Sequence, residues 1–128
     1  MTNGIVLVIE DNADNLALVR YLLERANYTV LAADNGISGL EIARMQKPDM
    51  VILDLTLPEL DGWHVAELLK SHLDTQHIPV VALTAHTLPG DRKRAFDSGC
   101  DAYITKPLDI PNFVNQINQL LIDKAPSD

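Results

Sequence analysis

The sequence predicts a doubly wound α/β fold, a (βα)5 sandwich with helices on both faces of a five-stranded parallel sheet. Two observations carry this prediction. Five short runs of β-branched and aliphatic residues alternate with five segments whose apolar residues recur at helical spacing. The first, third and fourth runs are apolar on both faces, as parallel strands covered by helices must be. These three strands are therefore expected at the centre of the sheet.

The expected strands are three to five residues long. Their ranges are 5–9, 29–33, 50–53, 80–83 and 102–104. Because all strands of a parallel sheet point the same way, the residues that follow them gather at one edge. That edge is where a functional site is expected.

The first two helices fill the intervals between the first three strands. The first is expected to begin near Asp14, which can cap it. The second is expected over 36–46, where it stops before Lys47-Pro48. The apolar stripe of the first helix consists of Leu16, Val19, Leu23 and Ala26.

The remaining helices follow the third, fourth and fifth strands. The third is expected over 63–72, with Val65, Leu68 and Leu69 buried. The fourth is expected to begin near Pro89 and to end at Gly99, a favourable helix stop. The last helix has Asp109 as its expected cap and an apolar stripe formed by Ile110, Phe113, Val114, Ile117, Leu120 and Leu121.

Length and composition favour one stand-alone domain. The 128 residues suit a single domain with its core over about 5–122 and a polar tail over 123–128. Apolar stretches long enough to span a bilayer and a signal-like N-terminus are both lacking, so a cytoplasmic location without membrane insertion is expected. The one cysteine, Cys100, cannot form an intramolecular disulfide and is interpreted as a small packing residue.

The net charge argues against direct binding to nucleic acid. It is −8, from 18 acidic and 10 basic residues, whereas nucleic-acid sites need clustered lysine and arginine. The densest basic run is Arg92-Lys93-Arg94. On a helix these three side chains point in different directions, so we interpret the run as a solvated surface rather than a polyanion site.

Chemically active residues follow four of the five strand runs. They are Glu10-Asp11, Asp54, Thr84 and Lys106. At one sheet edge they form a cluster of three carboxylates, a hydroxyl and an ammonium group. Clustered carboxylates repel one another at neutral pH, so the set suits a hard divalent cation such as Mg²⁺. The lysine and threonine then suit a phosphoryl group.

This pattern resembles the receiver domain of two-component response regulators, over about 5–122. It includes the acidic pair after the first strand and Asp54 after the third. It is completed by Leu57-Pro58, Asp61-Gly62, Thr84-Ala85 and Lys106-Pro107. The resemblance implies strand order 2-1-3-4-5 and a single-domain type similar to the chemotaxis regulators.

The resemblance also implies a phosphorylation site with a bound metal. Asp54 would be the phospho-acceptor. Asp11 and Asp54 would bind Mg²⁺ (or Mn²⁺) directly, Glu10 through water, and Thr56 through its backbone carbonyl. A simpler interpretation of Glu10-Asp11-Asn12, as a turn that caps the first helix, is weakened by Asp54 and Lys106 at matching strand ends.

In this family the remaining residues hold the phosphoryl group and transmit its presence. Lys106 would pair with phosphoryl oxygens, and its bond to Pro107 would be cis. Thr84 would donate its hydroxyl, and its movement would let Tyr103 turn inward. Tyr103 can also be read as an ordinary partly buried strand residue.

The implied function is phosphoryl transfer from a sensor histidine kinase or a histidine phosphotransfer domain. Phosphorylation would change the face built from the fourth helix, fifth strand and last helix, which a downstream protein reads. The chain would catalyse only its own phosphorylation and dephosphorylation. Glu10 replaces the more frequent aspartate, and the variable residues Thr56 and His86 are expected to tune the lifetime of the phosphoryl group.

Two other functions compete with this one. A phosphohydrolase of the haloacid-dehalogenase type also uses a strand-end aspartate, but Asp54-Leu55-Thr56 lacks the second aspartate of such enzymes. A binding module that is never phosphorylated is disfavoured because Asp54, Thr84 and Lys106 occur together. Nucleotide binding is disfavoured as well, since neither a Gly-rich fingerprint nor a P-loop follows a strand.

Overall fold

The computed structural model describes residues 3–57, 60–85 and 88–124, and strands and helices alternate along them. The strands are β1 (Ile5–Ile9), β2 (Thr29–Ala33), β3 (Met50–Asp54), β4 (Val80–Thr84) and β5 (Ala102–Thr105). The helices are α1 (Ala13–Arg25), α2 (Gly36–Gln46), α3 (Gly62–Ser71), α4 (Asp91–Asp97) and α5 (Ile110–Lys124).

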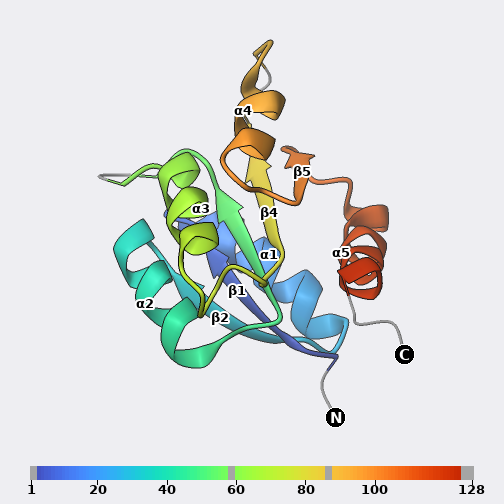
Figure 1. Ribbon diagram of the computed structural model, residues 1–128. Coiled ribbons are helices and arrows are strands. Elements are labelled where there is room, and N and C mark those ends of the chain that lie inside the picture. The colour runs from blue at the N-terminus through green and yellow to red at the C-terminus, as the bar shows by residue number, and fades with distance from the viewer. Residues whose placement is uncertain (1–2, 58–59, 86–87, 125–128) are drawn as a thin grey trace.

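The strands form one parallel sheet in the order β2-β1-β3-β4-β5 (Figure 1). This confirms the predicted fold class and strand order. The first, third and fourth strands are central, as their apolar sequences predicted, and every residue of β3 and β4 is buried.

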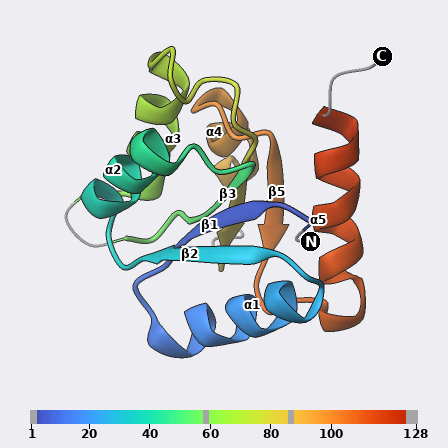
Figure 2. The same ribbon diagram turned by 90° about the horizontal axis from the view of Figure 1, so that it is seen from below.

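Two apolar layers enclose the sheet, with α2, α3 and α4 on one face and α1 and α5 on the other (Figure 2). Successive residues of β1 alternate between them: Leu7 and Ile9 join the first layer, and Val6 and Val8 join the second. Because both faces are covered, the accessible part of the sheet is its edge, where the strands end.

The start of α1 differs from the prediction. Asn12, not Asp14, is the N-cap: its backbone is extended, and its side chain accepts a hydrogen bond from the Asn15 N–H. Asp14 lies within the first turn, where a negative charge favours the helix dipole. The cap was misplaced because either residue type can serve there.

The start of α4 was also wrong in the prediction. The helix begins at Asp91 rather than near Pro89, because Gly90 has a φ of +94°. A residue in this left-handed conformation cannot continue a right-handed helix. The preceding turn is closed by the Asp91 side chain, which accepts from the Leu88 N–H. The result is a short fourth helix.

Smaller differences move element ends by one residue. The third helix begins at Gly62, since Asp61 caps it by accepting from the His64 N–H at 2.9 Å. Strands β3 and β4 extend to Asp54 and Thr84, which remain in the ladder with the neighbouring strands. These two polar side chains are therefore held by sheet backbone rather than by a loop.

In the last helix, Phe113 and Ile117 are fully buried against the sheet. Ile110, predicted on the same stripe, is 51% exposed because it lies in the first turn, before the helix reaches the core.

In the segments that the structure describes, no helix combines the length and apolarity needed to cross a membrane. Cys100 is buried, and burial raises the pKa of its thiol to about 12.

Candidate functional site

The site lies at the edge where the parallel strands end. Glu10 follows β1, Asp54 is the last residue of β3 and Thr84 the last of β4, while Lys106 follows β5. The ladder holds these backbones in a fixed order. The backbone N–H of Lys106, for example, donates to the Thr84 carbonyl at 2.8 Å.

Three carboxylates form the acidic part of the site. One oxygen from each of Glu10, Asp11 and Asp54 lies within 4.8 Å of the other two. Glu10 and Asp54 are only 2% and 6% exposed, whereas Asp11 is open to solvent. The Asp54 side chain is oriented by the Thr56 N–H, which donates to its Oδ1 at 2.9 Å. The other oxygen of Asp54, Oδ2, faces the ammonium group of Lys106.

Lys106 bridges two of these carboxylates. Its Nζ lies 2.8 Å from Glu10 Oε1 and 3.2 Å from Asp54 Oδ2. Burial by itself would lower the pKa of the ammonium group, but the bonds to Glu10 and the charge of Asp54 outweigh burial and raise it. The lysine therefore stays charged inside the site. The Lys106-Pro107 peptide bond is cis.

Glu10 has an unusual electrostatic environment for a carboxyl group. Burial is the main cause that raises its pKa to about 7, and the hydrogen bond and charge of Asp54 act in the same direction. Lys106 opposes them. Burial and the neighbouring Asp54 both disfavour the ionised form of Glu10, and a bound cation would favour it.

Thr84 and Tyr103 share one face of the sheet. Tyr103 is in register with Ala82, and Thr84 with Thr105, so the two side chains lie diagonally across β4 and β5. Thr84 is fully buried, whereas Tyr103 is half-buried. Thr84 therefore lies in the interior, and Tyr103 lies between the interior and the protein surface.

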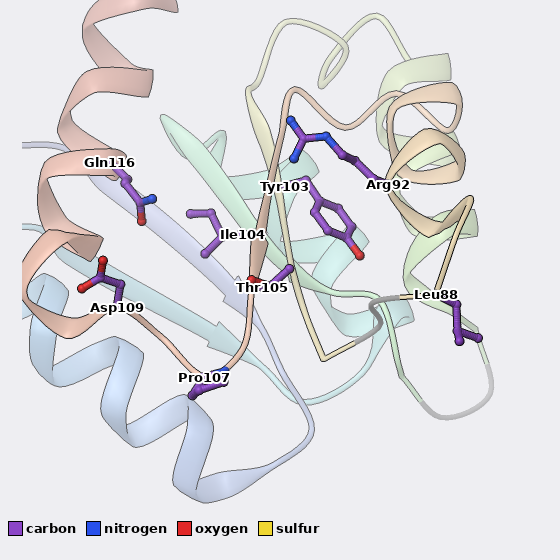
Figure 3. A pocket seen from close by; sticks show the side chains of 8 residues that line it. All are labelled: Leu88, Arg92, Tyr103, Ile104, Thr105, Pro107, Asp109 and Gln116. Atoms are coloured by element: carbon purple, nitrogen blue, oxygen red, sulfur yellow. The ribbon is translucent and has the colours of Figure 1, made fainter.

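On the surface side, Tyr103 lines an open pocket of about 410 Å³ between α4, β5 and the start of α5 (Figure 3). Its tyrosine ring points into the space beside α4. The residues that line the pocket are Leu88, Arg92, Tyr103, Ile104, Thr105, Pro107, Asp109 and Gln116.

The structure reveals a close backbone contact that the sequence did not. A Cβ atom on Gly62 would lie 2.5 Å from the Asp54 carbonyl oxygen and 2.5 Å from Leu55 Cα. The N-terminus of α3 therefore packs directly on the backbone of Asp54. The Asp61-Gly62 pair was recognised as part of a pattern, but its packing role depends on how helix and strand meet.

Of the other predicted site residues, Thr56 is exposed beside Asp54, and its carbonyl was predicted as a metal ligand. Pro58 and His86 lie outside the described residues. The ion pair between Glu10 and Lys106 was not predicted, because neither residue's sequence neighbours indicate it.

The donor set fits a hard divalent cation. Three carboxylates, two of them buried, converge within coordination range, and carboxylate oxygens are the protein ligands that Mg²⁺ prefers. Uncompensated buried carboxylates are costly, and the single positive charge of Lys106 is shared between the two buried carboxylates, Glu10 and Asp54. A divalent cation would complete this neutralisation.

Comparison with known proteins gives a consistent family. The family profile described as "Response regulator receiver domain" matches residues 6–118. The polar-differentiation response regulator DivK of Brucella anthropi is 40% identical over 118 residues, which cover 92% of this chain and 96% of DivK. DivK of Brucella ovis is 39% identical over the same shares of both chains.

Solved structures agree with the sequence relatives. The receiver domain of a signal transduction histidine kinase from Syntrophus aciditrophicus has a TM-score of 0.89 at 29% identity, covering 98% of this chain and 95% of that domain. The receiver domain of sensor histidine kinase PA1611 from Pseudomonas aeruginosa has a TM-score of 0.85 at 29% identity, covering 94% and 98%. That structure holds a magnesium ion in its active site cleft. These comparisons give no support to the phosphohydrolase alternative.

Proposed function

The chain belongs to the response regulator receiver domain family, and from this premise we propose that Asp54 accepts a phosphoryl group from a phosphohistidine of a sensor kinase or phosphotransfer domain. One Asp54 oxygen forms a bond to phosphorus while the P–N bond to the partner's imidazole breaks. The electron pair of the broken P–N bond stays on the imidazole nitrogen. The chain thereby acts as a signalling domain that catalyses only its own phosphorylation and dephosphorylation.

One observation carries this proposal: Asp54 lies at a strand end among two other carboxylates, with an ammonium group on its Oδ2. The Thr56 N–H fixes Oδ1 and Lys106 fixes Oδ2, so the carboxylate has a defined orientation. After transfer, Lys106 would bind phosphoryl oxygens through a charge-assisted hydrogen bond, and the Thr84 hydroxyl would donate to another.

Mg²⁺ (or Mn²⁺) would be held by Asp11, Asp54, the Thr56 backbone carbonyl and, through water, Glu10. Bound there, the cation would offset the repulsion between the carboxylate and the incoming phosphoryl anion. The close packing of the carboxylates supports this ligand set.

The output would be a change of the face formed by α4, β5 and α5, which a downstream protein recognises. Thr84 would move toward the phosphoryl group, and Tyr103 would then turn from the surface toward the space beside Thr84. Such a shift needs an active arrangement that binds the phosphoryl group better than the resting one. Thr56 and His86 would set how long the group persists.

Labelling with acetyl phosphate or a phosphoramidate and Mg²⁺ tests this proposal. Mass spectrometry should find one acid-stable, base-labile phosphoryl group on the wild type and none on Asp54→Ala. Asp34→Asn is a matched control, because Asp34 is an exposed aspartate that directly follows β2. An Asp54→Ala protein labelled at the wild-type rate would show that the acceptor lies elsewhere.

A further inference from the structure

The three basic residues of α4 make different side-chain contacts, and the Arg94 guanidinium lies 4.0 Å from the centre of the Trp63 ring. The Arg92 guanidinium lies 5.3 Å from the centre of the Phe96 ring and 5.9 Å from that of Tyr103. Lys93 pairs with Asp97 on the same helix. The run therefore does not form one cationic surface, and Arg92 is the member that contacts the proposed switch residue.

The contact between Arg92 and Tyr103 lies at the surface. Figure 3 shows both side chains beside one another in the open pocket between α4 and β5. The described residues that line this pocket include Arg92 and Tyr103 but not Thr84, which is fully buried. A tyrosine ring that moves toward Thr84 therefore leaves the pocket that it shares with Arg92.

We propose that Arg92 is a positioning residue that holds the Tyr103 ring at the surface and so favours the resting arrangement of the site. The inference rests on the proposed function, in which Tyr103 turns inward after phosphorylation. A guanidinium over an aromatic face is attracted by the ring quadrupole. An attraction made in only one of two arrangements shifts their equilibrium by its full value.

The size of the shift follows from the partial exposure of the contact. Cation–π contacts at exposed sites change an equilibrium constant by about two- to fivefold. Without the Arg92 contact, the inward arrangement should gain population by this factor. Anything that binds the inward arrangement should then bind tighter by a similar factor, provided the resting arrangement predominates.

The test measures the affinity of the full chain for beryllofluoride, a phosphoryl mimic, at saturating Mg²⁺. Arg92→Met removes the cation but keeps an unbranched side chain. Lys93→Met removes the same charge from the same helix, and the Lys93 side chain is 80% exposed. We expect Arg92→Met to bind the mimic about two- to fivefold more tightly than Lys93→Met, with Arg92→Lys in between.

NMR separates positioning from a merely structural role. In the unliganded Arg92→Met protein, the resonances of Tyr103 and α4 should move along the line that joins the free and mimic-bound wild type. Equal affinities of Arg92→Met and Lys93→Met would overturn the inference, as would a lower thermal midpoint with no shift along that line. If the mimic binds wild type and Asp54→Asn alike, the proposed function itself fails, and the inference fails with it.

Discussion

Replacing Asp11 by Asn removes the exposed carboxylate of the acidic cluster while nearly preserving its shape. Among the described residues, the ion pairs of Lys106 involve Glu10 and Asp54 but not Asp11. At the 4.8 Å limit of this cluster, two like charges repel by about 1 kcal/mol in water and by about 3.5 kcal/mol at an effective dielectric constant of 20. Because Asp11 is exposed, we expect the substitution to stabilise the metal-free protein by about 0.5–1 kcal/mol.

The same substitution should abolish most of the stabilisation by Mg²⁺. A ligand at tenfold excess over its Kd stabilises the folded wild type by about 1.4 kcal/mol. For 128 residues, with an unfolding entropy of about 2.1 cal/mol/K per residue, this raises the thermal midpoint by about 5 °C. Asp11→Asn should therefore start with a higher midpoint in EDTA but rise much less as Mg²⁺ is added.

Thermal unfolding followed by circular dichroism, in EDTA and across a Mg²⁺ titration, measures both effects. Asp34→Asn is again the control, since it removes one exposed carboxylate after β2. Its response to Mg²⁺ should match that of the wild type. Identical responses of wild type and Asp11→Asn would show that Asp11 is not a ligand, and a lower midpoint of Asp11→Asn in EDTA would refute the repulsion argument.

Two further predictions concern packing. Gly62→Ala should destabilise the protein by about 1–3 kcal/mol and weaken beryllofluoride binding, because its Cβ would meet the Asp54 backbone. The Cβ of Gly39→Ala would meet side-chain atoms instead, Ile9 Cγ1 at 2.8 Å and Ile9 Cδ1 closer still, which can shift more readily than backbone atoms. Gly39→Ala should therefore cost less in denaturant unfolding, and the reverse order would contradict this reasoning. The pKa of Cys100 is raised from 9.0 to about 12, so its thiol should not react with a disulfide reagent at pH 8 until the protein unfolds. Because the thiol ionises more readily in the unfolded chain, its contribution to stability should decline only as pH rises from about 9 to about 12. Rapid labelling of the native thiol would contradict its burial.

Much of the fold could be predicted because it depends on local patterns. The apolar runs of β1, β3 and β4 are long enough to indicate strands covered on both faces, and this placed them at the sheet centre. The parallel order then brings the residues after each strand to one edge. Glu10, Asp54 and Lys106 could therefore be selected together from the sequence.

Element ends were less predictable, because neighbouring residues compete for the same role. Asn12 and Asp14 can both cap a helix, and the choice depends on which backbone is extended where the chain leaves β1. The sequence around Pro89 is compatible with a first helical turn, but the left-handed conformation of Gly90 delays the helix to Asp91.

The sequence by itself determined the alternation of strands and helices, the central strands and the set of polar residues at their ends. Only the tertiary structure decided which of these side chains touch. The ion pair of Lys106 with Glu10 spans 96 positions of sequence, and the contact of Gly62 with the Asp54 backbone depends on the angle at which α3 meets β3. The direction of Arg92 toward Tyr103 likewise depends on how α4 packs beside β5. Residue types and spacing constrain backbone conformation, whereas such contacts are fixed by the relative placement of elements that are distant in the chain.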